Sequence, residues 1–350
     1  MRGFADPLAR GPDDAQILHM KIAIFDTQEF DRTSLEKAND GKHELRFFNA
    51  KLNPETALLA KGSDVACCSA HDKVDAASLC VLQLLGIRFV TLRSAGFNQI
   101  DLKEAKILGL TVARVPAYSP HAIAEHAVAL LLAENRKVPR AYARVRDLNF
   151  SLHGLMGFDL FGKTVGVIGT GKIGRAFGNI MKGFGCQILA FDKSPNSEWA
   201  RSVGAEYVSK ERLLRESNVI SLHLPLNPES KHIIDAAAFA MMKADAYLIN
   251  TGRGALIDTK ALVTALKRHK IGAACLDVYE EEENVFQTDR SEIGINDDTL
   301  ARLLTFPNVL ITAHQAFFTT EAVQQIAETT IMNVTKFAEK QNLGASLVEL

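Results

Sequence analysis

The stretch TVGVIGTGKIGRAFGNIMKGFG, residues 164–185, decides the fold class of this chain. The apolar run TVGVI is typical of a buried strand; it leads into three glycines with the spacing G-x-G-x-x-G, and a helical pattern follows. A second strand pattern, QILAF at 187–191, ends at Asp192, 18 positions after Gly174. The glycine spacing alone would also fit an ordinary turn. Strand, turn, helix, strand and acidic residue together predict the first βαβ unit of a dinucleotide-binding sheet.

Each part of this turn has an expected role in holding a dinucleotide. Gly169 would permit the tight turn, Gly171 would let the backbone approach the pyrophosphate, and Gly174 would let the helix pack on the strand. The free N–H groups at the start of the helix would face the phosphates. Asp192 would accept hydrogen bonds from the adenosine ribose hydroxyls and repel a 2′-phosphate, which favours NAD; Lys193 is the one neighbour that could soften this preference.

Short apolar runs alternate with helical patterns on both sides of this unit, which predicts parallel sheets covered on both faces. The strands expected before it are residues 21–25, 44–49, 64–69, 88–93 and 111–115. The strands expected from it onward are residues 164–168, 187–191, 219–224, 246–250, 273–276 and 308–312. Two such series in 350 residues predict two α/β domains.

Two long helical patterns are informative about how these domains connect. Residues 120–147 separate the two series and read as a long helical stretch opened by Pro120. Residues 319–341 read as a helix that no strand follows. A lone terminal helix of that length must cover apolar surface, so we expect it to return to the first domain and make that domain discontinuous.

Composition excludes several classes of protein. The chain is 47% hydrophobic and 23% charged with a net charge of -1, which describes a globular protein without a nucleic-acid-binding surface. Its apolar runs are shorter than the roughly 20 residues that a membrane span needs. The five cysteines lack C-x-x-C spacing, so we expect buried thiols rather than a disulfide framework or zinc site, and a cytoplasmic protein.

Two further segments are expected to carry no function. Residues 1–19 lack the apolar core of a secretory signal and precede the first strand, so we expect an extension outside the fold. His121 and His126 lie five positions apart, which separates their rings on a helix, so no metal site is expected there or elsewhere.

Three polar segments follow expected strands of the second series, namely NTGRG (250–254), DVYEEE (277–282) and AHQAF (313–317). In an open parallel sheet such segments converge beyond the carboxyl ends of the strands. Arg253 could bind a carboxylate and polarise a carbonyl, and His314 could exchange a proton with the resulting alkoxide. Glu282 could stabilise the imidazolium. Taken singly, each has a plainer interpretation: a structural histidine, an ordinary turn, or a solvated acidic loop at 280–283.

The same segments give the chain a resemblance to a known family. It resembles the D-2-hydroxyacid dehydrogenases from about residue 21 to near the C-terminus, and within them most closely the D-lactate dehydrogenases. The motifs that carry the resemblance are LRSAGFNQIDL (92–102), RVPAYSPHAIAEHAVAL (114–130), GKTVGVIGTGKIGRAF (162–177), LINTGRGALID (248–258), LDVYEEE (276–282) and TAHQAF (312–317).

The resemblance implies a fold and a set of site residues. It implies two doubly wound domains around a cleft: a flavodoxin-like substrate domain of residues 20–118 and 315–350, and a Rossmann NAD-binding domain of residues 119–314. The implied catalytic residues are Arg253, Glu282 and His314. The expected cofactor-binding residues are Gly169, Thr170, Gly171, Lys172, Ile173, Gly174, Asp192, Pro225, Thr251 and Asp277. The expected substrate-binding residues are Ala95 and Gly96 at the carboxylate, Tyr118 at the hinge, Arg253, His314 and Phe317.

The resemblance also implies an activity, the reduction of pyruvate to D-lactate with NADH, in a homodimer or homotetramer. The D stereochemistry follows from the resemblance alone. Two other interpretations stay open: a reductase for hydroxypyruvate, glyoxylate or a branched 2-keto acid, and a non-enzymatic NADH-sensing scaffold similar to the C-terminal binding protein co-repressors. The motifs VPAYSP and HQAF favour the lactate branch of the family.

Overall fold

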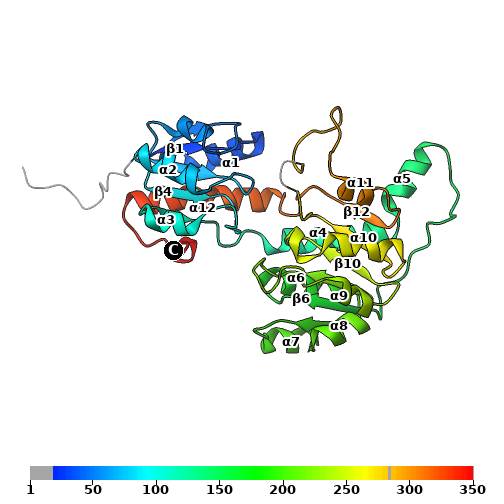
Figure 1. The fold of residues 1–350 in the computed structure, drawn as a ribbon. Coiled ribbons are helices and arrows are strands. Elements are labelled where there is room, and N and C mark those ends of the chain that lie inside the picture. The colour runs from blue at the N-terminus through cyan, green and yellow to red at the C-terminus, as the bar shows by residue number, and fades with distance from the viewer. Residues whose placement is uncertain (1–18, 283–284, 350) are drawn as a thin grey trace, which may run out of the picture. The chain divides into compact units, whose positions relative to one another are not determined.

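The computed structural model describes residues 19–282 and 285–349, and the chain forms two compact units. Unit 1 comprises Met1–Tyr118 and Thr320–Leu350, and unit 2 comprises Ser119–Thr319 (Figure 1). The second crossing of the chain therefore lies at residue 320, five positions later than the expected 315. The expected extension lies outside the described residues, apart from His19.

Unit 1 is built on a five-stranded parallel sheet with the order β2-β1-β3-β4-β5. Its strands are β1 (Lys21–Ile24), β2 (Glu44–Phe47), β3 (Val65–Cys68), β4 (Phe89–Leu92) and β5 (Thr111–Ala113). This is the strand order of the flavodoxin-like doubly wound fold, so the sequence expectation is confirmed. The strands end one or two residues earlier than the apolar runs that predicted them.

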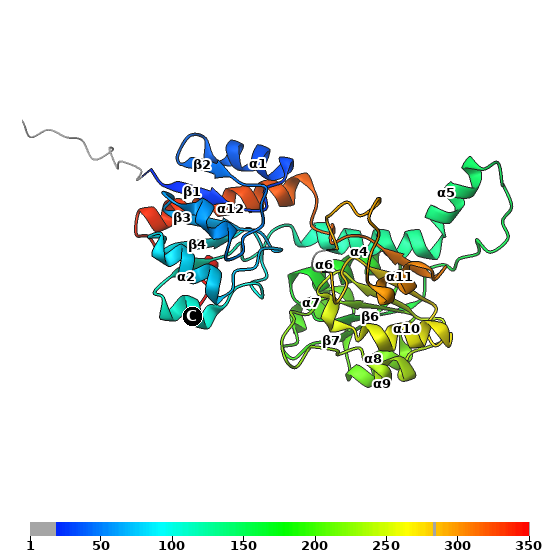
Figure 2. The same ribbon diagram turned by 45° about the horizontal axis from the view of Figure 1, so that its top comes forward.

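Alternation along the strands divides the core of unit 1 between the two faces of the sheet. In β3, Val65 and Cys67 pack with one cluster, and Ala66 and Cys68 pack with the other. The helices of the unit are α1 (Glu29–Asn39), the 3-10 helix η1 (Thr56–Ala60), α2 (Ala76–Leu84), α3 (Leu102–Ile107), α12 (Thr320–Ala338) and the 3-10 helix η3 (Gly344–Ser346). α1 and α12 lie side by side on one face, as Figures 1 and 2 show. The other face is covered by η1, α2 and α3.

The C-terminal segment completes unit 1. Ala327, Ile331 and Val334 of α12 are buried against the sheet. The ring of Phe337 stacks on Phe89 with centroids 4.3 Å apart. The apolar stripe of this terminal helix thus covers, together with α1, one face of the sheet.

Unit 2 contains a seven-stranded parallel sheet with the order β12-β11-β10-β9-β6-β7-β8. Its strands are β6 (Thr164–Ile168), β7 (Gln187–Phe191), β8 (Glu206–Tyr207), β9 (Val219–Leu222), β10 (Tyr247–Asn250), β11 (Ala273–Leu276) and β12 (Val309–Ile311). Counted from β6, this is the Rossmann order with one strand added at an edge. The sequence did not predict β8, because two residues are too few to carry a period.

Helices cover both faces of this sheet (Figures 1 and 2). One cluster places α4, α6 and α7 on one face, and a second places α8 to α11 on the other. The helices are α4 (Pro120–Asn135), α5 (Val138–Arg146), α6 (Lys172–Gly183), α7 (Ser197–Val203), α8 (Lys210–Glu216), α9 (Ala236–Met241), α10 (Thr259–Lys267) and α11 (Asp298–Leu304), with the 3-10 helix η2 (Gly254–Leu256).

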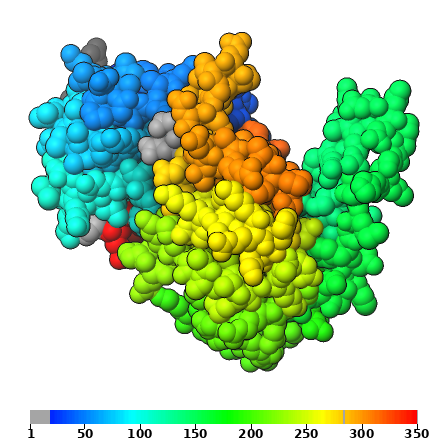
Figure 3. Space-filling model, turned by 45° about the vertical axis from the view of Figure 1, so that its right-hand side comes forward, coloured from blue at the N-terminus to red at the C-terminus, as the bar shows by residue number. Residues whose placement is uncertain are grey.

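The helical stretch expected at 120–147 is in fact broken. α4 ends at Asn135, Lys137 takes a left-handed conformation with φ +50°, and α5 begins at Val138. Pro139 lacks the N–H that would continue the helical hydrogen bonding, which accounts for the break. Residues 138–161, here called the arm, comprise α5 and the loop after it. The arm stands out from the rest of unit 2 in Figure 3.

Two properties of the described chain bear on its chemistry. None of the helices in residues 19–282 and 285–349 is long and apolar enough to cross a membrane. The five cysteines are free thiols, and four of them are buried. Burial raises the pKa of Cys67 to about 12, so this thiol stays protonated and unreactive near neutral pH.

Candidate active site

The segments that follow β11 and β12 meet at the carboxyl edge of the unit 2 sheet. His314 Nδ1 lies 2.7 Å from Glu282 Oε1, and both side chains are about one-fifth exposed. The backbone N–H of His314 donates to the carbonyl of Asp277, 2.7 Å away. A histidine and a carboxylate at hydrogen-bond distance form a pair that can hold and transfer a proton.

The carboxylate of Asp277 organises the turn that carries His314. It is fully buried, and it accepts hydrogen bonds from the Thr312 hydroxyl at 2.6 Å and from the amides of Gln315 at 2.9 Å and Ala316 at 2.8 Å. Burial by itself would raise the pKa of Asp277, but these hydrogen bonds and one with His126 outweigh it and lower the pKa. The carboxylate is therefore ionised at neutral pH. We call this carboxylate and its hydrogen bonds to Thr312, Gln315 and Ala316 the Asp277 clamp.

The clamp holds His314 in an unfavourable backbone conformation. Its φ is +55°, in the left-handed region that costs a residue with a side chain about 1–3 kcal/mol. The bonds to Asp277 lie on both sides of His314, at the hydroxyl of Thr312 and the amides of Gln315 and Ala316. The bonds of Gln315 and Ala316 hold these residues to unit 2, which extends to Thr319 rather than to the expected residue 314.

A residue that the sequence did not assign to the site, His126 of α4, contacts the clamp. Its Nε2 lies 3.1 Å from Thr312 Oγ1 and 3.4 Å from Asp277 Oδ1. Its spacing from His121 predicts that the two histidines form no metal site, and the sequence predicts no other role for His126. No spacing in the sequence links residue 126 to residue 277, so the contact emerges only from the packing of α4 on the sheet.

Arg253 lies in the turn after β10, next to the acidic loop. The Asn250 side chain spans this turn: its Oδ1 accepts from the Gly252 amide at 3.1 Å, and its Nδ2 donates to the Arg253 carbonyl at 2.9 Å. A Cβ on Gly254 would lie 2.1 Å from the Tyr279 backbone, so glycine is required for this close approach. None of the ion pairs among the described residues involves Arg253. Its Nη1 donates to the carbonyl of the preceding residue, Gly252.

The described residues of the acidic run at 280–283, Glu280 to Glu282, each have a different environment. Glu280 accepts from the Thr259 hydroxyl at 3.0 Å and lies 2.6 Å from His232 Nε2, so its role is structural. Glu281 is exposed. Glu282 contacts His314 and also accepts from the Tyr279 amide at 3.0 Å. Residue 283 lies outside the described residues, so the solvated-loop interpretation fits only Glu281 among the rest.

The glycine turn between β6 and α6 has the geometry that a dinucleotide requires. Gly169 has φ +94°, and a Cβ on Gly174 would lie 1.9 Å from the Gly169 carbonyl oxygen, so neither position tolerates a side chain. A Cβ on Gly171 would meet nothing within 4 Å, so the backbone at the first turn of α6 is open to approach. Lys172 and Ile173 occupy that first turn, where N–H groups lack helical partners.

Asp192 stands at the end of β7, beside the glycine turn. Its Oδ2 accepts from the Thr170 amide at 2.6 Å, and its Oδ1 accepts from the Ser194 amide at 2.8 Å. Lys193, which could soften a preference against a 2′-phosphate, forms an ion pair with Glu229 instead. These residues fit an NAD ribose with its two hydroxyls.

Two other expected cofactor residues lie at the ends of β9 and β10. The Thr251 hydroxyl is buried and has no hydrogen-bond partner among the described residues, as expected of a group whose partner is a ligand. The Pro225 carbonyl accepts from the Ser230 hydroxyl at 2.6 Å. His223, directly after β9, is partly buried, and desolvation lowers its pKa to about 3 and keeps it neutral.

In unit 1, the turn Ser94–Gly96 after β4 directs its carbonyls into the protein. The Ser94 carbonyl accepts from the Val115 amide at 3.1 Å, the Ala95 carbonyl from Arg114 Nη1 at 2.7 Å, and the Gly96 carbonyl from the Ser94 hydroxyl at 2.7 Å. No described residue accepts a hydrogen bond from the amide of Ala95 or of Gly96. Unpaired amides on a turn are suited to an anion such as a carboxylate.

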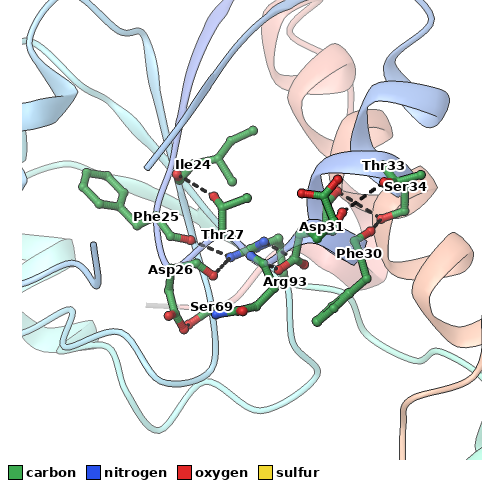
Figure 4. Close-up of polar contacts among 12 residues, drawn as sticks. Ile24, Phe25, Asp26, Thr27, Phe30, Asp31, Thr33, Ser34, Ser69 and Arg93 are labelled. Atoms are coloured by element: carbon green, nitrogen blue, oxygen red, sulfur yellow. Dashed lines mark hydrogen bonds and ion pairs between the residues drawn. The ribbon is translucent and has the colours of Figure 1, made fainter. Parts of the chain in front are cut away.

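Arg93 fixes the backbone immediately before this turn (Figure 4). Its side chain is 3% exposed; Nη2 donates to the Phe25 carbonyl at 2.6 Å, and Nη1 lies 2.8 Å from Asp31 of α1. Asp26, in a left-handed conformation with φ +46°, accepts from the Ser69 hydroxyl at 2.7 Å. The carboxyl ends of β1, β3 and β4 are thereby tied together.

The remaining expected substrate residues lie at the ends of the units. Tyr118 is the last residue of the first segment of unit 1, and Phe317 lies in unit 2 with its ring 6.0 Å from that of Phe318. Both are partly buried. Of the expected residues, Arg253, Asp277, Glu282 and His314 lie on neighbouring segments of unit 2, whereas Ala95 and Gly96 belong to unit 1.

Comparison with known proteins identifies the family of the chain. Residues 128–316 match the family described as "D-isomer specific 2-hydroxyacid dehydrogenase, NAD binding domain". The chain is 47% identical over 332 residues to "2-hydroxyacid dehydrogenase homolog 1" of Schizosaccharomyces pombe, covering 94% of this chain and 100% of that protein. It is 46% identical over 330 residues to "D-lactate dehydrogenase" of Escherichia coli, with the same coverage.

A solved structure gives the same result for the fold. The structure described as the pyruvate reductase of Chlamydomonas reinhardtii superimposes with a TM-score of 0.89 at 38% identity, covering 94% of this chain and 99% of that one. With 94% of the chain covered, the similarity extends over most of both units.

The Asp277 clamp predicts the effect of removing one charge. In Asp277→Asn the amide nitrogen would face a backbone N–H that it cannot accept from, leaving that donor buried and unpaired. We expect the free energy of unfolding near neutral pH to fall by about 3 kcal/mol, measured by urea denaturation. Glu281→Gln is the matched control, since it removes one exposed charge from the same loop, and it should change stability by less than about 0.5 kcal/mol.

Wild type and Asp277→Asn also test the clamp through the pH dependence of stability. The pKa of Asp277 is lowered in the folded state, so its contribution to stability is complete above the ordinary aspartate value of about 3.9 and is lost as the pH falls through the folded-state pKa. The stability difference between wild type and Asp277→Asn should therefore narrow below about pH 4. A difference that stayed constant into acid, or was absent at neutral pH, would contradict the clamp.

Proposed function

The chain belongs to the NAD-dependent D-2-hydroxyacid dehydrogenases, and we propose that within this family it reduces pyruvate to D-lactate. The observation that carries the proposal is the pairing of His314 with Glu282 at 2.7 Å on the turn held by Asp277. Support for pyruvate comes from the relatives, one named for D-lactate and one for pyruvate reduction, both aligned over 94% of the chain.

Arg253 is assigned to the substrate. Its guanidinium can donate two parallel N–H bonds to the carboxylate and to the adjacent keto oxygen, which withdraws electron density from the carbonyl carbon. No acidic side chain of the described residues pairs with it, so an anion would not have to displace an internal partner. The amides of Ala95 and Gly96 are assigned to the carboxylate of the same substrate.

His314 is assigned to the proton. Its Nδ1 faces Glu282, so a proton on Nδ1 is held by the carboxylate and the second ring nitrogen, Nε2, is the one that serves the substrate. In reduction, the carbonyl carbon gains a hydride and the carbonyl oxygen takes the proton from Nε2, which completes the hydroxyl group. Glu282 stabilises the imidazolium that must exist before this transfer, and the ring regains its proton from solvent.

NADH, when bound, supplies the hydride. The residues assigned to it are those of the glycine turn, 169–174, with Asp192 at the ribose and Pro225, Thr251 and Asp277 nearer the nicotinamide. Asp277 also holds the turn of His314 through its three hydrogen bonds, so we assign two roles to this residue. We place the reaction in the cytoplasm, as in fermentation, where NADH is available and thiols such as Cys67 stay reduced.

The direct test compares substrates. Steady-state rates with NADH are measured for pyruvate, hydroxypyruvate, phenylpyruvate and 2-ketoisocaproate, and the product of pyruvate is resolved by chiral chromatography. We expect the highest kcat/KM with pyruvate and D-lactate as the product. A higher kcat/KM with another keto acid would reassign the substrate, and no turnover of any of them would refute the proposed activity.

Arg253→Lys tests the assignment of Arg253. Lysine keeps the charge but loses the planar fork, so the substrate carboxylate and the polarised carbonyl are both held less well. We expect kcat/KM for pyruvate to fall by about 100-fold, with a higher KM and a lower kcat. Arg268→Lys, an exposed arginine at the end of α10, is the control and should behave as wild type. Impaired NADH binding with normal pyruvate kinetics would show that Arg253 is wrongly assigned.

Asp192→Ala tests the preference for NAD. Wild type should have a far higher kcat/KM with NADH than with NADPH. Loss of the carboxylate removes the ribose hydrogen bonds and the repulsion of a 2′-phosphate, so the ratio of the two values should fall by about tenfold or more. Glu198→Ala, which removes a nearby charge from α7, should leave the ratio unchanged. Equal use of both cofactors by wild type would refute the assignment.

We also propose that the arm joins two copies of the chain. Its large apolar side chains are unusually exposed, which for a globular protein indicates a surface that another protein covers. The exposed residues are Tyr142 (64%), Leu148 (78%), Phe150 (70%), Leu152 (84%), Met156 (92%) and Phe161 (81%). A second copy carries the same surface, and a two-fold pair would bury both arms at once.

The mass in solution tests this. By light scattering after gel filtration, the wild type should have twice the chain mass of 38.3 kDa or a larger even multiple. The double substitution Leu152→Glu and Met156→Glu should shift it toward 38.3 kDa. Leu84→Glu, an equally exposed leucine of unit 1, is the control and should leave the mass unchanged. A monomeric wild type would refute the proposal.

A further inference from the structure

We propose that Arg114 is a positioning residue for the substrate carboxylate, an inference that rests on the proposed function. Arg114 directly follows β5 and is half-buried. Its Nη1 donates to the carbonyl oxygen of Ala95 at 2.7 Å, a charge-assisted hydrogen bond to the turn assigned to the carboxylate. Arg114 does not contact the substrate in this proposal; it acts through the peptide group between Ala95 and Gly96.

Peptide geometry links the two sides of this group. The peptide is trans and planar, so its carbonyl and its N–H point in opposite directions. Fixing the Ala95 carbonyl on Arg114 therefore fixes the direction of the Gly96 N–H, for which no described residue is an acceptor. A positive charge on the carbonyl oxygen also polarises the peptide and makes its N–H a stronger donor.

Arg114 is itself held from several directions within unit 1. Its guanidinium carbon lies 5.1 Å from the centre of the Phe97 ring, a cation–π contact. Its amide donates to the Ser346 carbonyl at 2.8 Å, and its carbonyl accepts from Asn333 Nδ2 at 3.1 Å. Asn333 is fully buried in α12. The direction of the Gly96 amide is thus set by the terminal helix and the C-terminal segment of the chain.

A purely structural role predicts a different outcome. If Arg114 only joined β5 to the turn after β4, its loss would lower stability and leave substrate binding unchanged in the protein that remains folded. A positioning role predicts weaker binding of the carboxylate in both the ground state and the transition state, which raises the KM for pyruvate and leaves kcat nearly unchanged.

The experiment compares Arg114→Met, Arg114→Lys and Arg88→Met with wild type. Arg88 is the matched control: its guanidinium also donates to backbone carbonyls, those of Gln83 and Ile87, at the opposite end of β4. KM and kcat are measured for pyruvate at saturating NADH and for NADH at saturating pyruvate, with the melting temperature of each protein.

We expect Arg114→Met to raise the KM for pyruvate about tenfold or more, with the KM for NADH unchanged. Arg114→Lys should show a smaller rise, because the charge remains, and it carries the test if Arg114→Met does not fold. A KM for pyruvate equal to that of Arg88→Met, whatever the melting temperature, would overturn the inference. A wild type that reduces no 2-keto acid would instead refute the proposed function.

Discussion

The ionised, buried carboxylate of Asp277 is the constraint on which the candidate site depends. Its two oxygens accept hydrogen bonds from the Thr312 hydroxyl and the amides of Gln315 and Ala316, and these bonds flank His314, whose φ is +55°. We expect the left-handed backbone of His314 to relax if the carboxylate is lost, and Nδ1 to move away from Glu282. The position of His314, to which we assign the proton transfer, therefore depends on the ionised carboxylate of Asp277.

The two units fix their functional turns with groups of opposite charge. In unit 2 a carboxylate accepts hydrogen bonds from backbone N–H groups, and the side chain of His314 remains paired with Glu282. In unit 1 two arginines collect backbone carbonyls: Arg93 binds the ends of β1, and Arg114 binds Ala95. Because each peptide carries one donor and one acceptor, collecting the carbonyls leaves the N–H groups of the turn for an anion. Both turns follow strands of a parallel sheet, and the carboxyl ends of such strands lie at one edge of the sheet.

The sequence predicts most of the fold because buried parallel strands are near-continuous apolar runs, and the glycine turn carries its own spacing. The break before α5 follows from Pro139, whose effect on a strong helical pattern was not anticipated. The boundary at 320 rather than 315, the contact of His126 with Asp277 and the bond of Arg114 to Ala95 depend on side chains far apart in sequence. No local pattern encodes such contacts. The acidic run shows the same limit, since only packing separates the structural Glu280 from the Glu282 that faces His314.

The most direct measurement is the pH dependence of kcat/KM for pyruvate in wild type and Glu282→Gln, at saturating NADH and fixed ionic strength. In the proposed reaction, reduction needs protonated His314, and the charge of Glu282, 2.7 Å away, stabilises that form. The alkaline limb of the profile should therefore move to lower pH in the variant, while oxidation of D-lactate should retain activity at lower pH than in wild type. A carboxylate in a solvated loop would give only a small, salt-sensitive shift. Superimposable profiles would contradict the pairing of Glu282 with His314 as the proton-transfer device.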